Sequence, residues 1–212
     1  MTKKIFYLVF LAIFISGCND KNVSDLKKNY EYKSKDIKEL KEYFEKIVPK
    51  NYYVTIRYNS SDNINLVVYE PTNIPDKNDL LFQQWDVDFE DYEEPKDSHF
   101  NSEYDGKTKS LDVVKKKLNW SNNTFTELYE KLENVNSMGI SSGKPIKIEY
   151  GFRGMGVLSY LFFDHNLSKT EQKENSNNCS QMFYKENIVF TFSSGAIGSF
   201  CIPDFEKNSN KK

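Results

Sequence analysis

Apolar residues recur at helical spacing in three stretches of the chain. Within each stretch, residues three and four positions apart would share one face of a helix, and a serine stands where its hydroxyl can cap the first turn. We therefore expect helices over about 34–48, 110–118 and 121–135. The apolar stripes consist of Ile37, Leu40, Phe44 and Ile47, of Leu111, Val114 and Leu118, and of Phe125, Leu128, Leu132 and Val135.

Strand-like runs, rich in β-branched and aromatic residues, make up much of the remaining apolar sequence. Two of them flank the turn-forming segment 59–63, which predicts a hairpin. Runs of strands interrupted by helices are typical of an α+β fold. We therefore expect a single α+β domain with a mostly antiparallel sheet and with helices packed on one face. The expected strands cover 52–58, 64–69, 80–89, 146–152, 157–163, 181–184 and 188–192, with a short segment at 197–201.

The first eighteen residues follow a different pattern. Met1–Lys4 is short and basic, and Ile5–Ile15 is an unbroken apolar run of eleven residues. This run is too short to cross a membrane as a helix, which takes about 20 residues, and it has the length of the apolar region of a secretory signal. It ends in Ile15-Ser16-Gly17-Cys18, which resembles the lipobox of bacterial lipoproteins: an aliphatic residue, two small residues and a cysteine.

The resemblance implies that Cys18 carries a diacylglycerol on its sulfur and, after cleavage before this residue, an N-acyl lipid on its new amine. Two or more acyl chains anchor a protein stably, so the mature chain would be held at a lipid bilayer in the cell envelope. No other cofactor is expected. The remaining interpretations are a signal whose cysteine is incidental and a buried apolar strand.

The lipobox divides the chain into four expected parts. Residues 1–17 form the signal peptide, and residues 18–33 comprise the lipidated cysteine and a flexible tether. The tether is expected because 19–33 is rich in Lys, Asn and Asp and has few apolar residues. The globular domain spans 34–205, and 206–212 is a frayed tail.

Two cysteines, Cys179 and Cys201, remain if Cys18 takes lipid. Exported bacterial proteins meet an oxidising compartment, which predicts a Cys179–Cys201 disulfide. In the chain-entropy model such a bridge stabilises by roughly 3 kcal/mol. A redox or metal-binding pair is the alternative, but the spacing is far from C-x-x-C and no histidine lies between the two cysteines.

Composition narrows the class of protein further. Of the 212 residues, 38% are hydrophobic and 15% are aromatic, which indicates a folded rather than a disordered chain. The formal net charge of −2 argues against a protein that coats nucleic acid. Removal of Lys3 and Lys4 with the signal leaves 27 basic and 31 acidic residues, a net charge of −4. With only two histidines in the chain, no metal site is expected.

The densest cluster of charge lies in segment 86–94. Regular strand alternation would turn Trp85, Val87 and Phe89 toward the core and the carboxylates between them outward. The simplest interpretation is a solvated strand edge. Calcium binding by the carboxylates at 86, 88 and 90 is an alternative, although the segment lacks the glycine and spacing of a helical calcium loop. Attraction of a basic partner protein is another. The possible partner-binding residues are Asp86, Asp88, Glu90 and Asp91.

Two glycine-containing motifs invite a chemical interpretation. Segment 139–143 matches G-x-S-x-G, the nucleophile elbow of serine hydrolases, with Ser141 at its centre. That elbow needs a strand before it and a helix after it, whereas here the order is reversed, so we expect a flexible turn. Segment 151–156 is expected to be a hairpin turn. Its Arg153 is a further possible partner-binding residue.

These patterns favour a non-catalytic binding protein of the envelope, for instance an immunity-type protein that neutralises a toxin. A small hydrolase is one alternative, and it would place Ser141 or Glu149 opposite His165 or another carboxylate in a deep pocket. A carbohydrate- or peptide-binding module is the other, and exposed co-planar tryptophans would favour it. We expect instead that Trp85 is in the core and that Trp120 fills the joint between two helices.

Overall fold

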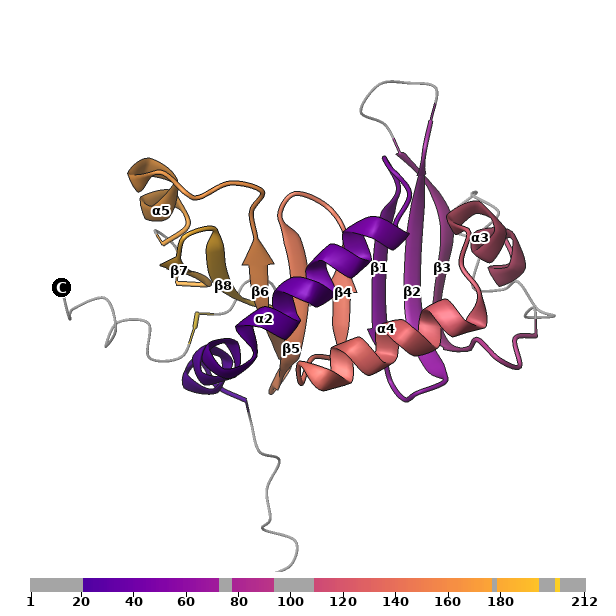
Figure 1. Cartoon of the computed structure of the whole chain (residues 1–212), viewed down its shortest axis with the longest axis horizontal. Coiled ribbons are helices and arrows are strands. Elements are labelled where there is room, and N and C mark those ends of the chain that lie inside the picture. The colour runs from indigo at the N-terminus through magenta and orange to yellow at the C-terminus, as the bar shows by residue number, and fades with distance from the viewer. Residues whose placement is uncertain (1–20, 73–77, 94–108, 177–178, 195–200, 203–212) are drawn as a thin grey trace, which may run out of the picture.

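A computed structural model describes residues 21–72, 78–93, 109–176, 179–194 and 201–202. These residues form one eight-stranded antiparallel sheet, with helices α2 and α4 lying across one of its faces (Figure 1). The expected α+β class is therefore confirmed. The helices are α2 (Val23–Ile47), α3 (Leu111–Leu118), α4 (Asn122–Asn134) and α5 (Lys169–Glu174). The strands are β1 (Tyr53–Tyr58), β2 (Asn63–Pro71), β3 (Asn78–Asp88), β4 (Gly139–Ser141), β5 (Ile146–Arg153), β6 (Gly156–Phe162), β7 (Gln181–Lys185) and β8 (Ile188–Ser194).

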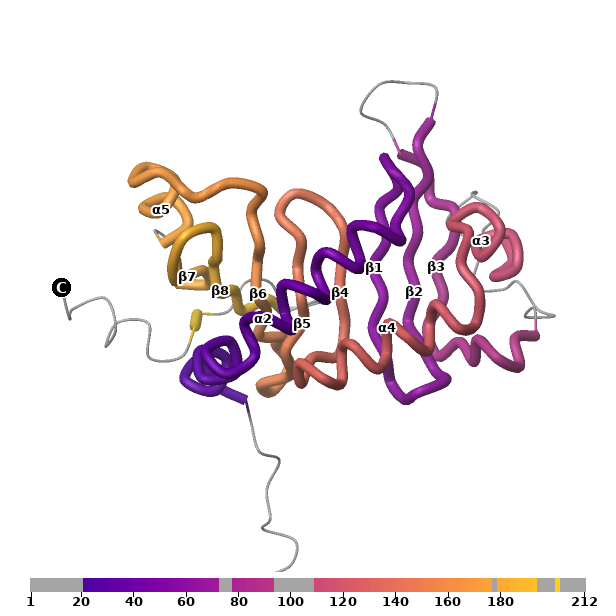
Figure 2. The backbone as a smooth tube through the Cα atoms, viewed as in Figure 1, coloured from indigo at the N-terminus to yellow at the C-terminus, as the bar shows by residue number. Residues whose placement is uncertain are grey.

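Helix α2 begins well before the expected start at Ser34, so the expected tether over 18–33 is wrong from Val23 onward. The side chain of Asn22 caps the helix by accepting a hydrogen bond from the backbone N–H of Asp25. Val23, Leu26 and Tyr30 are spaced three and four residues apart and are buried, because they continue the apolar stripe of the helix. The helix bends at Lys33, whose backbone is not helical, and Figure 2 shows this change of direction.

The strand order is β3-β2-β1-β4-β5-β6-β8-β7, and all neighbours are antiparallel. The short strand β4 joins the two halves of the sheet by pairing with both β1 and β5. The segment 139–143 was expected to be a flexible turn, which is wrong for Gly139–Ser141, whereas Ser142 and Gly143 lie in the connection to β5. A Cβ on Gly139 would lie 2.8 Å from the carbonyl oxygen of Ile56, so β4 can pack this closely only with glycine there.

Strand alternation gives the sheet two chemically different faces. The face under the helices carries the core, including Ile56, Leu66 and Ile148, all fully buried. Tyr58 also points to this side, where its hydroxyl donates a hydrogen bond to the carbonyl of Phe125 in α4. We call the opposite side the back face. On β1, β2 and β5 it carries Thr55, Arg57, Asn65, Val67, Lys147 and Glu149.

Regular alternation fails in β3, and the prediction that Trp85 lies in the core is wrong. Trp85 is 56% exposed. The register passes from Leu66–Gln84 to Ile64–Val87, so both Trp85 and Asp86 lie opposite Asn65 in a β-bulge. Asp86 has a positive φ of 56°, and its backbone N–H donates to the side chain of Asn65 at 2.9 Å. The extra residue reverses which side chains point inward.

Trp120 and the cysteine pair lie as predicted. Trp120 is buried between α3 and α4, and its indole N–H donates to the carbonyl of Ile47 at 2.8 Å. Cys179 and Cys201 form a disulfide, which confirms the predicted pairing. The lipobox, the tail 206–212 and most of the expected segment 197–201 lie outside the described residues. No helix within the described ranges has both the length and the hydropathy needed to span a membrane.

Candidate functional site: the back face of the sheet

Strand register aligns polar residues in a single row across the back face. Each member is the register partner of the next, so the row crosses from β2 to β7 through every strand between them. The members on β6 and β8 are buried, whereas those on β1 and β2 reach solvent in part. Gly139 and Glu149 are buried as well, so at the centre of the row, on β1, β4 and β5, only Arg57 reaches solvent in part. In order, the row is Asn65, Arg57, Gly139, Glu149, Ser159, Thr191 and Gln181.

Arg57, Lys147 and Glu149 form an ion cluster at this centre. The Nε and Nη2 atoms of Arg57 each lie 2.7 Å from Oε2 of Glu149, and Nζ of Lys147 lies 2.8 Å from Oε1. Only 4% of the Glu149 side chain is exposed, against 29% for Arg57 and 31% for Lys147. The carboxylate is therefore enclosed beneath the two cations. Gly139 lies between Arg57 and Glu149 in the row, and its missing side chain leaves the space that Arg57 crosses.

Glu149 remains ionised in this arrangement. Burial by itself would raise the pKa of its carboxyl, but the charges of Lys147 and Arg57 and their hydrogen bonds outweigh burial and hold the pKa below its ordinary value. An ionised carboxylate held by two cations cannot act as a general acid near neutral pH. The electrostatic arrangement therefore suits a fixed charge pattern better than proton transfer.

An exposed aromatic ring adjoins the cluster. Phe152 is 51% exposed, and the guanidinium carbon of Arg57 lies 5.2 Å from the centre of its ring. A register shift between Glu149 and Gly151 puts Phe152, opposite Val157, on the back face. Without that bulge, alternation from Glu149 would have placed Arg153 there instead. The site thus joins surplus positive charge to an apolar surface.

Arg153 and the acidic segment are not adjacent in the sheet. Arg153 opens the tight turn to β6, as expected for a hairpin in which Gly154 has a positive φ of 53°. The turn lies at the same end of the sheet as the end of β3, but β2, β1 and β4 lie between the two. At about 4.8 Å per strand this separates them by roughly 19 Å.

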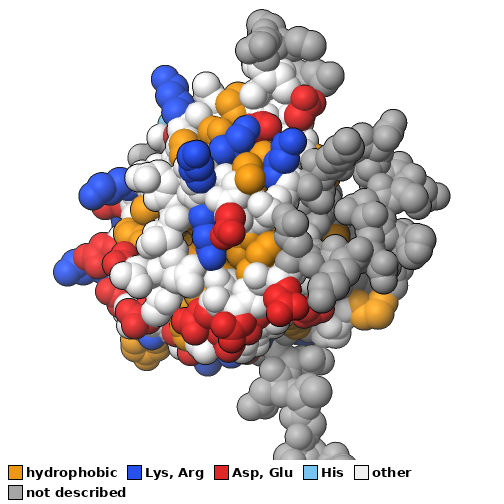
Figure 3. Space-filling view, turned by 90° about the vertical axis from the view of Figure 1, so that its right-hand side faces the viewer, with side chains coloured by type: hydrophobic (Ala, Val, Ile, Leu, Met, Phe, Trp, Pro, Cys, Tyr) orange, Lys and Arg blue, Asp and Glu red, His pale blue; other side chains and the backbone are white. Residues whose placement is uncertain are grey.

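Two carboxylates of the acidic segment have structural partners within the chain. Asp88 accepts hydrogen bonds at 3.0 Å from the backbone N–H groups of Glu90 and Asp91, so it caps the turn after β3. Asp86 accepts a hydrogen bond from the side-chain amide of Asn59 at 2.9 Å. Figure 3 views the molecule from the side on which β3 and α3 lie. It shows acidic side chains gathered along the lower part of this side, with basic side chains above them. These contacts favour the solvated, turn-forming interpretation of the segment.

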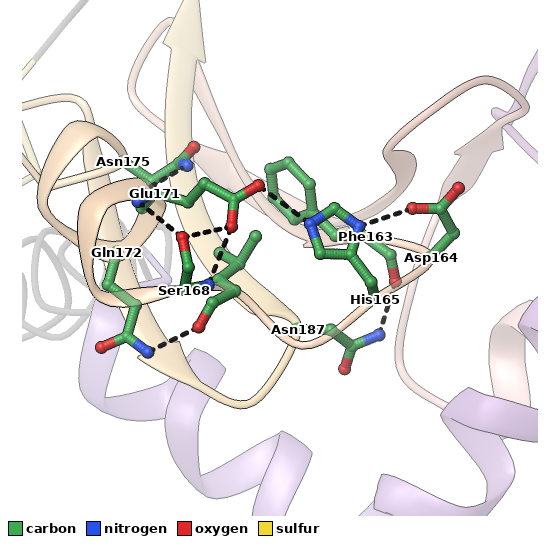
Figure 4. Close-up of polar contacts among 9 residues, drawn as sticks. Phe163, Asp164, His165, Ser168, Glu171, Gln172, Asn175 and Asn187 are labelled. Carbon is green, nitrogen blue, oxygen red and sulfur yellow. Dashed lines mark hydrogen bonds and ion pairs between the residues drawn. The ribbon is translucent and has the colours of Figure 1, made fainter.

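The residues of the hydrolase interpretation have other partners. Ser141 is buried in β4, and its hydroxyl accepts a hydrogen bond from that of Thr55 at 3.0 Å. It therefore lies in an extended strand rather than at a strained elbow. His165 follows β6 on the surface, where its ring nitrogens lie 2.9 Å from Asp164 and 2.9 Å from Glu171 (Figure 4). Glu171 also accepts hydrogen bonds from the backbone and hydroxyl of Ser168, which caps α5.

A hollow of about 510 Å³ lies beside the C-terminal part of α2, where β1 and β5 begin and β4 and β6 end. The turn at Arg153 lies at the opposite end of these strands. The volume of the hollow is within the range of small-molecule sites. Its charged residues largely compensate one another, because Lys41 pairs with Glu45 and Lys144 pairs with Asp164. Across the described ranges, no group of three His, Cys, Asp or Glu side chains could hold a metal ion. The back-face cluster is the stronger candidate, because its carboxylate is enclosed beneath two cations and an exposed aromatic ring adjoins it.

Comparison with models of protein families, with curated proteins and with solved structures found no match for this chain. The candidate site therefore stands on its own geometry. Sequence reasoning missed the Arg57–Lys147–Glu149 cluster, because its members come from strands far apart in the chain. The alternation Lys147–Glu149, with both on one side of a strand, was the only local signal available.

Proposed function

We propose that this protein is a lipid-anchored protein of the bacterial cell envelope whose α+β domain binds a protein partner and does not catalyse a reaction. The observation that carries the binding role is the Arg57–Lys147–Glu149 cluster beside exposed Phe152. The anchoring role rests on the resemblance of Ile15–Cys18 to a lipobox. An immunity-type protein, which neutralises a toxin by surface complementarity, is the specific form that we favour.

A buried ion cluster needs an explanation beyond stability. Replacing such a cluster by apolar residues of similar size is often neutral or stabilising, because removing charges from water is costly. Fixed charges at a surface instead confer specificity on binding and exclude wrong partners. The partly exposed cations and the neighbouring phenyl ring have the composition of an interface centre, in which arginine and aromatic residues are enriched.

The anchoring role is tested by acylation in cells. We expect an alkyne-tagged fatty acid fed to the cells to label the full chain, and Cys18→Ser to abolish the label and release the protein from membranes. Cys18→Ser protein that still sediments with membranes and still carries the label would contradict the lipid anchor.

The binding role is tested by the size of the native complex. We expect the full chain, extracted from its own membranes in a mild detergent, to migrate above its monomer mass. Phe152→Ser should return it to the monomer mass, because it removes an exposed ring and leaves the fold intact. Tyr32→Ser is the matched control, since Tyr32 is an exposed aromatic residue on α2. Wild-type protein that migrates as a monomer, or a complex that withstands Phe152→Ser, would contradict partner binding at this face.

A further inference from the structure

The ion cluster on the back face carries more positive than negative charge. Arg57 and Lys147 face one carboxylate, Glu149, so the cluster has a net charge of +1. Arginine has five N–H donors and lysine three. The carboxylate of Glu149 contacts Nε and Nη2 of Arg57 and Nζ of Lys147. Among the described residues Nη1 of Arg57 has no hydrogen-bond partner, so it can donate to a ligand.

The surplus charge is on the solvent side of the cluster. The two cations are each about one third exposed, whereas Glu149 is almost fully enclosed. A molecule approaching the back face therefore meets the two cations before it meets the carboxylate. The acidic balance of the whole chain makes this surface electrostatically distinct.

We propose that Arg57 and Lys147 bind a carboxylate of an acidic segment of the protein partner, while Phe152 packs against an apolar side chain next to that carboxylate. This inference rests on the proposed function and names the chemistry of the partner. The fork of the guanidinium group matches two carboxylate oxygens. The ring of Phe152 already stacks on Arg57 and leaves about half of its surface for a second apolar contact.

Charge complementarity calls for an anion at this site, and the exposed ring of Phe152 favours a polypeptide over a free anion. Inorganic phosphate could use the same donors but would leave the exposed ring of Phe152 without a partner. An acidic segment with an apolar neighbour satisfies both parts of the site, and the sheet surface around them can contact a larger molecule. The remaining sources of anionic charge, free phosphate and lipid headgroups, are outcomes that the experiment distinguishes.

The test is a titration of the full chain in detergent micelles, followed by NMR of the side chains of Arg57, Lys147 and Phe152. The probe is the peptide acetyl-Glu-Phe-Glu-Phe-Glu-amide, and the comparison probes are acetyl-Lys-Phe-Lys-Phe-Lys-amide and inorganic phosphate. We expect saturable shifts of these three side chains with the acidic peptide alone, and an affinity that falls about tenfold when the salt concentration is raised from 0.05 to 0.5 M.

Two substitutions should change the affinity in opposite directions. Arg57→Gln should lower the affinity for the acidic peptide at least fivefold, because it removes the fork of donors. Glu149→Gln should raise it about fivefold, because it removes the internal competitor for the same cations. A purely structural ion cluster would not bind more tightly after the second change. Lys116→Gln, on the exposed side of α3, is the control and should leave the affinity unchanged.

The inference is overturned if Glu149→Gln weakens binding in protein that retains its near-ultraviolet circular dichroism. Equal binding of the basic peptide would overturn it as well. Phosphate that binds as tightly as the acidic peptide and displaces it would assign the site to a phosphate or headgroup instead. Each of these results leaves the native complex measured with Phe152→Ser unaffected, so failure of this inference is distinguishable from failure of the proposed function.

Discussion

Arg57 reaches across Gly139 to bind Glu149, two strands away in the sheet. Its Nε lies 2.7 Å from the carboxylate, and a Cβ on Gly139 would lie 3.2 Å from both Cα and Cβ of Arg57. The ion pair and the close packing of β4 therefore depend on the same glycine. Gly139→Ala should destabilise the protein by about 2 kcal/mol, a typical cost of overpacking. Urea unfolding measures this loss, and an unchanged midpoint would contradict the packing.

The buried cluster should respond differently to single and paired substitutions. Arg57→Met leaves Glu149 with one cation, and we expect a loss of about 2 kcal/mol, somewhat below the usual cost for a fully buried pair because Arg57 is partly exposed. Adding Glu149→Met should recover most of that loss, since the pair is then replaced by apolar side chains. Equal losses for the single and double variants in urea unfolding would show that the pair is not coupled.

The low pKa of Glu149 gives stability a defined dependence on pH. The folded-state pKa is lower than the unfolded one, so the stabilisation is present above the ordinary carboxyl value and is lost as the pH falls through the folded pKa. We expect Glu149→Gln to flatten the acid limb of the unfolding free energy below about pH 4.5. Identical acid limbs for the wild type and the variant would contradict an ionised Glu149.

His165 should titrate above its ordinary pKa. Hydrogen bonds to Asp164 and Glu171 stabilise the imidazolium and raise its pKa above 6.5. Hydrogen bonds from His165 and Lys144 lower the pKa of Asp164 to about 2, and hydrogen bonds from Ser168 and His165 lower that of Glu171 to about 2. The stabilisation is therefore complete below pH 6.5 and is lost as the pH rises through the folded pKa. Proton NMR should show the His165 midpoint falling toward 6.5 in Glu171→Gln, and a midpoint that stays fixed would contradict the link.

Residues 23–33 should contribute to the folded core. Leu26 is fully buried, and Leu26→Ala should cost about 3 kcal/mol through the cavity that it leaves. Tyr32→Ala on the exposed side of the same helix should change stability by less than about 0.5 kcal/mol. Chemical denaturation of both variants tests this pair of expectations. Equal, small effects would restore the interpretation of this segment as a flexible tether.

The sequence predicts those parts of the fold that depend on local spacing. Apolar residues at 37, 40 and 44 define one side of α2, and the serines before α3 and α4 stand at their N-caps. The first half of α2 escaped prediction because it follows a polar segment rich in Lys, Asn and Asp, although Leu26 and Tyr30 continue the stripe. The bulge at Asp86 is likewise invisible in a regular pattern, and it moved Trp85 to the surface.

The candidate site could not be predicted from local sequence patterns, for a different reason. Arg57 and Glu149 are 92 residues apart, and only the insertion of β4 between β1 and β5 brings them together. Their pairing depends on the register of three strands, which no single segment of the chain encodes. The disulfide could be predicted because only two cysteines remain besides Cys18 and because an exported protein meets an oxidising compartment. Neither argument depends on the register of the strands.

Photo-crosslinking in the native envelope tests the central claim most directly. A photoreactive phenylalanine analogue placed at Phe152 lies on the back face, and the same analogue at Tyr32 lies on an exposed part of α2. On irradiation of intact cells, we predict a discrete crosslinked protein adduct from position 152 and none from position 32. No adduct from position 152, or the same adduct from both positions, would contradict partner binding at the back face of the sheet.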